Sequence, residues 1–186
     1  TGHTVWVTLT DSTRAFKAAA VLTTEVISDW GGQIGFATWR QGWTPSNPDL
    51  VAGDWVSVRV DDGYSNTIHI GAISGRVNAA ADTIYGTITS DWFTQTLNMA
   101  CEVWVQNGPN WIQQTVDPNG GSYLCDFSTV GWDLLPGQSV AVSYFEPDSD
   151  RVFNVFQAPT LDVNYGHDGV EANYEAGHTV WVTLTG

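Results

Sequence analysis

Nine residues near the start of the chain read Gly2-His3-Thr4-Val5-Trp6-Val7-Thr8-Leu9-Thr10. The same nine letters return without a substitution as Gly177-His178-Thr179-Val180-Trp181-Val182-Thr183-Leu184-Thr185. Apolar and polar residues alternate along both copies, which is the period of a half-buried β-strand. An identical run that includes both His and Trp does not arise by chance, so it indicates a repeated strand.

The two copies lie 175 residues apart. We interpret this distance as the period of a tandem array, in which residues 1–175 form one module and residues 176–186 the first strand of the next. The joint between modules is expected at about residues 160–175. An engineered permutation or an added strand is the alternative. No signal peptide is visible, and Thr1 opens directly into a strand pattern, so we expect the chain to start inside a larger protein.

A fainter pattern, Gly-x-x-Val-x-Val, occurs three times within the module. It starts at Gly2, Gly53 and Gly137. Nine positions after these glycines come the acids Asp11, Asp62 and Glu146. A polar turn and a second alternating segment follow each acid, at residues 15–24, 67–70 and 151–156. The pattern predicts three similar β-hairpins.

The rest of the chain also alternates with a period of two, and its 19 glycines and 7 prolines mark turns. Residues 13–21 contain an alanine run with some helical character, but we expect a strand there because the alternating pattern continues beyond it. About a dozen short strands result. The predicted fold is all-β, an antiparallel two-sheet β-sandwich or a jelly-roll-like module. A chain of 186 residues is long enough for one large β domain or two small ones that share an interface.

Acidic residues outnumber basic ones by 20 to 6, which gives a net charge of −14. Nucleic acid and anionic lipid surfaces would repel such a chain, and the sequence contains no apolar run of 18 residues that would insert into a membrane. We therefore expect neither nucleic acid nor a membrane as a partner. The carboxylate excess fits solubility outside the cell, cation binding or a neutral ligand.

The two cysteines, Cys101 and Cys125, each lie in a predicted strand. We expect a disulfide that ties two neighbouring strands and stabilises the fold by roughly 3–4 kcal/mol. Two buried free thiols are the alternative. A disulfide favours a secreted or cell-surface protein.

Aromatic residues supply the first candidate binding site. Trp39 and Trp43 lie four positions apart in a glycine-rich segment, and Tyr64 lies in a polar turn. Exposed aromatic rings bury flat apolar area against a ligand, so these three residues are candidates for stacking on sugar rings. Packing of the tryptophans in the core is the alternative.

Acidic turns supply the second candidate. Asp61 and Asp62 lie in one turn, and Asp148 and Asp150 in another. Calcium takes six to eight oxygen ligands, so either turn is a candidate calcium site, although neither matches an EF-hand loop. Solvated turns without an ion are the alternative. We expect no other cofactor.

Catalytic motifs are missing from the sequence: it contains neither Gly-x-Ser-x-Gly nor His-Glu-x-x-His. The acids are concentrated in turns rather than on apolar strands, where burial would raise a pKa as glycoside hydrolysis requires. We therefore expect no enzymatic activity, with a glycan hydrolase as the less favoured alternative.

Four runs resemble known proteins. They are residues 48–56, residues 169–183, Asp91-Trp92-Phe93-Thr94 and Trp132-Asp133-Leu134-Leu135-Pro136-Gly137-Gln138. The chain resembles the tandem-repeat β-sandwich modules of long secreted or surface proteins from environmental bacteria, which have no assigned function. This resemblance implies an extracellular location and a surface or matrix role, and it transfers no catalytic or binding residue.

We therefore expect a non-catalytic extracellular module with a structural or adhesive role, whose partners are neighbouring copies of the module or polysaccharide. The duplicated strand suggests assembly into filaments by strand donation. The donated residues would include His178, Val180, Val182 and Leu184. A carbohydrate-binding module is the alternative.

Overall fold

The computed structural model describes residues 1–27, 32–38, 42–103, 110–174, 179–183 and 185. Within these residues the chain is all-β, as the sequence predicts, with sixteen strands in several antiparallel sheets. About a dozen strands were predicted, and the difference lies in strands of two or three residues, which are too short to show a periodicity. The chain divides into two compact units, Thr1–Ala72 with Thr89–Gln95 and Ile73–Ile88 with Thr96–Gly186. A repeat boundary near residue 176 stays a prediction.

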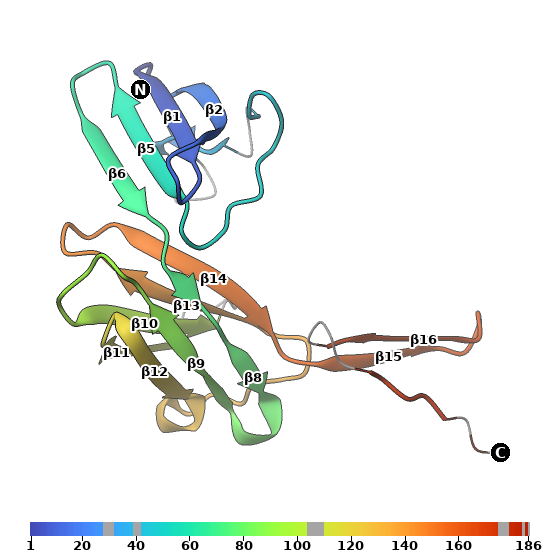
Figure 1. Ribbon diagram of the computed structural model, residues 1–186. Coiled ribbons are helices and arrows are strands. Elements are labelled where there is room, and N and C mark those ends of the chain that lie inside the picture. The colour runs from blue at the N-terminus through green and yellow to red at the C-terminus, as the bar shows by residue number, and fades with distance from the viewer. Residues whose placement is uncertain (28–31, 39–41, 104–109, 175–178, 184, 186) are drawn as a thin grey trace. The chain divides into compact units, whose positions relative to one another are not determined.

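The first unit contains a four-stranded sheet with the order β2-β1-β5-β6 (Figure 1). Its strands are β1 (Thr4–Thr10), β2 (Phe16–Thr23), β5 (Trp55–Val60) and β6 (Ser65–His69). A smaller sheet pairs β3 (Glu25–Ile27) with β4 (Gln33–Gly35). The alanine run forms strand β2, as predicted, because its alternate residues Ala18, Ala20 and Leu22 are buried.

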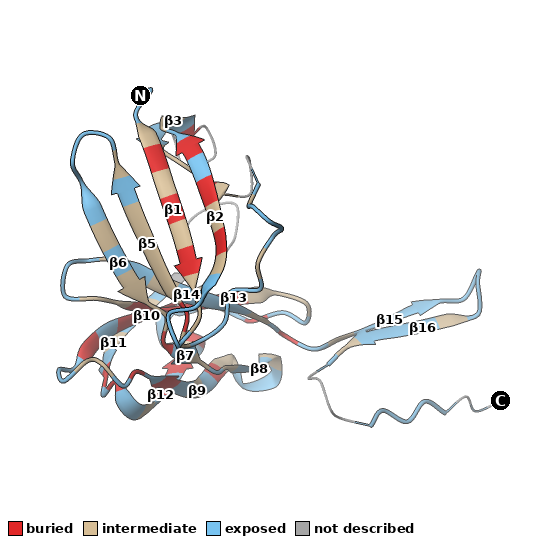
Figure 2. Ribbon diagram, turned by 45° about the horizontal axis from the view of Figure 1, so that its top comes forward, coloured by how far each residue is buried: buried red, intermediate tan, exposed pale blue. Residues whose placement is uncertain are grey.

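Strand β1 supplies much of the core of this unit. Val5, Val7 and Leu9 are at most 2% exposed, and Figure 2 shows buried residues alternating along β1 and β2. The half-buried side chains of Phe36 and Trp43 pack against these two strands. Full burial of a Val or Leu side chain stabilises by roughly 1.5–3 kcal/mol, so the first unit depends strongly on this strand.

All three predicted hairpins are present, as β1–β2, β5–β6 and β13–β14. The same two backbone hydrogen bonds close the open end of each. The glycine N–H donates to the carbonyl of the residue after the return strand, and that residue donates to the carbonyl of the residue after the glycine. The groups are Gly2 and His3 with Thr24, Gly53 and Asp54 with Ile70, and Gly137 and Gln138 with Ala158. The three glycines have φ between +80° and +92°, a region that other residues rarely adopt.

The second unit is built from two main sheets. One has the order β11 (Asn110–Val116), β10 (Leu97–Val103), β13 (Ser139–Phe145) and β14 (Arg151–Gln157). The other has the order β12 (Asn119–Asp126), β9 (Thr83–Thr89) and β7 (Ala72–Ile73), and β8 (Arg76–Asn78) also pairs with β9. Two 3-10 helices are present, η2 (Ala79–Ala81) and η3 (Phe127–Val130). The predicted joint region forms a largely exposed hairpin of β15 (Thr160–Asn164) and β16 (Gly169–Asn173) (Figure 2).

Cys101 and Cys125 form the predicted disulfide, with their Cα atoms 6.4 Å apart. The expectation that it ties neighbouring strands is wrong. Cys101 lies in β10 and Cys125 in β12, which belong to different sheets, because β11 takes the place beside β10. Both cysteines are fully buried. The bond therefore joins the two sheets through the core, an arrangement consistent with a β-sandwich.

Candidate functional site

The candidate site is the slot that β1 fills between β2 and β5. Val7 lies opposite Ala20 of β2 and opposite Val58 of β5, so a strand in this slot is hydrogen-bonded along both edges. Its inward side chains enter the core, and its outward side chains lie on the opposite face of the sheet. A segment that takes this place must match both the length and the alternation of β1.

Asp61 fixes the point at which β1 enters the slot. One carboxylate oxygen, Oδ1, lies 2.7 Å from Nδ1 of His3, and the other, Oδ2, accepts the Thr4 N–H at 2.7 Å. The bond from Thr4, followed by that from His3, holds the pKa of Asp61 below its usual value. Asp61 was predicted as a calcium ligand, and that stays a prediction; in the structure both of its carboxylate oxygens contact residues at the start of β1. The second copy of the strand carries the same His-Thr pair.

The outward residues of β1 also make specific contacts. The guanidinium carbon of Arg59 lies 4.4 Å from the centre of the Trp6 ring, and the two residues are opposite each other in the sheet. Thr8 lies opposite Ser57. The two copies are therefore identical at the buried positions and also at the outward positions, where β1 contacts its neighbouring strand.

The second copy has a different environment. Residues 179–183 belong to no strand, and Val180, Trp181 and Val182 are 58%, 84% and 61% exposed. The other two predicted donor residues, His178 and Leu184, lie outside the described residues. The repeated sequence thus forms a central strand in its first copy, and the described residues of its second copy, 179–183, are exposed.

The turn that contains Asp62 fits the solvated alternative. Asp62 Oδ1 accepts the N–H of Tyr64 at 3.0 Å, which is the hydrogen bond of an Asx turn. Tyr64 itself is 54% exposed.

The second acidic turn brings together three carboxylates, those of Glu146, Asp148 and Asp150. Oxygens from all three lie within 4.8 Å of one another, and this is the one such group among the described residues. Glu146 Oε1 is buried and has no hydrogen-bond partner there. Burial, together with the charges of Asp148 and Asp150, raises the pKa of Glu146 to about 7. These oxygens are of the type that calcium prefers, and calcium binding here stays a prediction.

The structure describes two of the three residues of the predicted aromatic site, Trp43 and Tyr64, and these two have different environments. Trp39 lies outside the described residues. Trp43 packs against the core of the first unit, which fits the alternative of a structural tryptophan. Tyr64 is exposed at the tip of the β5–β6 hairpin.

An aromatic stack in the first unit was missed. The His69 ring lies parallel to that of Trp55, with centroids 3.8 Å apart, and 3.6 Å from the ring of Trp92. The guanidinium carbon of Arg14 lies 3.3 Å from the centre of the Trp55 ring. Trp55 and His69 are paired across the β5–β6 hairpin, but Arg14 and Trp92 come from distant segments, so no local pattern reveals the whole stack. It attaches the segment around Trp92 to the β5–β6 hairpin.

No protein-family model matches the sequence, and no curated protein or solved structure is significantly similar to it. None of the described helices is long and apolar enough to cross a membrane. The function is therefore inferred from the β1 slot and its duplicated strand.

Proposed function

We propose that the chain is a non-catalytic structural or adhesive module of a secreted, tandem-repeat surface or matrix protein, in which residues 177–185 serve as strand β1 of a neighbouring module. One observation supports this proposal above all. The sequence that forms a central strand with two hydrogen-bonded edges occurs a second time, and the described residues of this second copy, 179–183, are exposed.

Insertion of the second copy into a slot like that of β1 would remove its apolar side chains from water. Val180 and Val182 would take the places of Val5 and Val7, which are almost completely buried. Backbone hydrogen bonds would give the affinity and the pockets for alternate side chains the specificity, as in other cases of strand addition. The His-Thr pair would meet the acceptor's equivalent of Asp61.

The neighbouring module follows in the same polypeptide or belongs to another chain. In the second case each chain donates a strand to the next, and the contact is head-to-tail, so it produces filaments rather than closed dimers. The buried disulfide and the net charge of −14 support a secreted or surface location.

The experiment compares the mass in solution of the full chain with those of three truncated forms, by size-exclusion chromatography with light scattering. A chain without residues 1–10 has one slot and one strand copy, so we expect it to form oligomers that grow with concentration. A chain without residues 1–10 and 177–186 should stay single, with its first unit unfolded. The form without residues 177–186 alone should stay single and folded.

A synthetic peptide with the sequence of residues 177–186 provides the control. Added in excess to the chain without residues 1–10, it should fill the slot and prevent oligomers. The same peptide with Val180→Asp and Val182→Asp should have no effect, because charged side chains cannot enter the core. The proposal would be contradicted if every form were a monomer, or if the two peptides had the same effect on the chain without residues 1–10.

A further inference from the structure

A groove in the second unit is a candidate binding site, which a purely structural role does not require. The groove has two adjoining parts. The part lined by Gly75 and Phe156 has a volume of about 320 Å³, and the part lined by Asn78 and Tyr85 has a volume of about 490 Å³. The two parts share four lining residues, Arg76, Val77, Pro159 and Tyr174. Both volumes fall in the range of small-molecule sites, which is roughly 300–1,000 Å³.

Strands β8 and β9 place a charged and an aromatic side chain next to each other in this groove. Arg76 lies directly opposite Tyr85 in the antiparallel pair, so the two side chains share a face. Val77, between Arg76 and Asn78, is buried in the core. Asn78 therefore points to the same side as Arg76 and also lines the groove.

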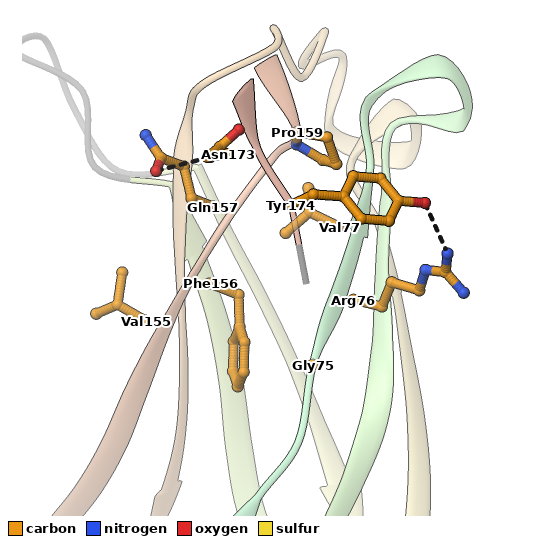
Figure 3. A pocket seen from close by; sticks show the side chains of 9 residues that line it. All are labelled: Gly75, Arg76, Val77, Val155, Phe156, Gln157, Pro159, Asn173 and Tyr174. Carbon is orange, nitrogen blue, oxygen red and sulfur yellow. Dashed lines mark hydrogen bonds between the residues drawn. The ribbon is translucent and has the colours of Figure 1, made fainter. Parts of the chain in front are cut away.

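The base of the β15–β16 hairpin holds a second aromatic ring over Arg76. Figure 3 shows the Tyr174 hydroxyl directed at the guanidinium, and the Arg76 Nη2 donates to it at 3.4 Å. Asn173 anchors the base: its side chain accepts the Thr160 N–H at 2.5 Å and donates to Gln157 Oε1 at 2.8 Å. The position of Tyr174 is therefore set by hydrogen bonds of the adjacent residue.

Phe156 and Gly75 also line the groove and lie close to each other (Figure 3). A Cβ atom on Gly75 would lie 2.6 Å from Cδ2 of the Phe156 ring, so any other residue would displace the ring. Glycine at position 75 therefore leaves room for the Phe156 ring, which gives this part of the groove an apolar surface.

The chemistry of the lining selects the ligand class. Tyr85 and Tyr174 are 43% and 50% exposed, and each offers a flat apolar surface with a polar tip. Arg76 and Asn78 supply hydrogen-bonding groups, and no carboxylate is among the residues described as lining the groove. Aromatic faces flanked by a few hydrogen-bonding groups suit a pyranose ring, which has apolar C–H faces and hydroxyl edges. The overall charge of −14 disfavours a polyanion.

We infer that this groove binds a neutral saccharide, as part of a polysaccharide chain, between Tyr85 and Tyr174. The site differs from the aromatic trio that the sequence suggested. It also differs from the β1 slot, because all of the described residues that line it belong to the second unit.

Affinity electrophoresis of the full chain tests the inference, in gels that contain xyloglucan, galactomannan, arabinoxylan or dextran, with alginate as the acidic comparison. Migration should be retarded by at least one neutral polymer. Tyr85→Ala and Tyr174→Ala should each weaken binding about tenfold, the loss of one aromatic contact. Tyr174→Phe, which keeps the ring, should bind better than Tyr174→Ala.

Matched controls are Phe16→Ala and Tyr165→Ala, since both aromatic side chains are exposed and neither lines the groove. They should leave binding unchanged, and thermal unfolding should confirm that all variants are folded. Removal of residues 177–186 should also leave binding unchanged, which separates this inference from the strand proposal. No retardation by any neutral polymer, retardation by alginate alone, or a loss of binding in Tyr165→Ala but not in Tyr174→Ala would overturn it.

Discussion

Ionisation of Glu146 opposes folding. Its pKa rises from an ordinary value of 4.5 to about 7 in the folded chain, so the folded state binds a proton more tightly than the unfolded state. The stability that this protonation gives is complete below about pH 4.5 and is lost as the pH rises to about 7. Asp148 and Asp150 add to the effect, because their charges repel the ionised form.

Glu146→Gln mimics the protonated form. In buffer with EDTA we expect the Tm of this variant to exceed that of the parent chain at pH 8 and to equal it at pH 4.5. The control is Glu171→Gln, which removes an exposed carboxylate outside the cluster. Melting followed by circular dichroism measures both. Equal Tm values for Glu146→Gln and the parent at pH 8 would show that the cluster does not destabilise the fold.

Single residues are also where sequence reasoning was least able to assign roles. Asp61 and Asp62 are adjacent and chemically identical, so the sequence alone gives no reason to assign them different roles. Only the fold separates them, by bringing His3 and Thr4 to Asp61 from 57 or more positions away. Trp43 is a similar case, because a ring that packs on a core and a ring that binds sugar look the same in a sequence.

At the scale of elements, the disulfide between β10 and β12 joins the two sheets of the second unit. It links positions 24 residues apart, so the constraint on the unfolded chain stabilises the fold by about 3–4 kcal/mol. We expect the Cys101→Ala, Cys125→Ala double variant to lose about this much free energy of unfolding in urea. Parent chain reduced under the same conditions is the control and should lose a similar amount. An unchanged urea midpoint would contradict the structural role of the bond.

The hairpins were predictable because their signals are local. A glycine at a positive φ, an alternating strand, an acidic turn and a return strand lie within about twenty residues. The order of strands in each sheet was not predictable, because pairing between β1 and β5 depends on which distant strand has a matching face. The groove was not predictable for the same reason, because Tyr174 is brought to Arg76 and Tyr85 from a distant segment.

At the scale of the whole molecule, the duplicated strand is the feature that most needs an explanation. Burial in the core explains why its apolar residues recur, but the other residues are identical too. In the first copy, His3 contacts Asp61, Trp6 contacts Arg59, and Thr8 lies opposite Ser57. To make the same contacts, the second copy would need a second slot of the same shape, which the proposed neighbouring module would supply. This reasoning supports the proposed array, in which each module would share a strand with its neighbour.

A cysteine trap tests this claim most directly. Thr183 is the equivalent of Thr8, which lies opposite Ser57 in the sheet. In a chain without residues 1–10 that carries Ser57→Cys and Thr183→Cys, mild oxidation should produce a ladder of cross-linked chains on a non-reducing gel. A chain with Ser57→Cys and Val182→Cys should not cross-link, since residue 182 would face the core. Absence of the ladder, cross-links within single chains only, or equal cross-linking in both variants would contradict strand donation.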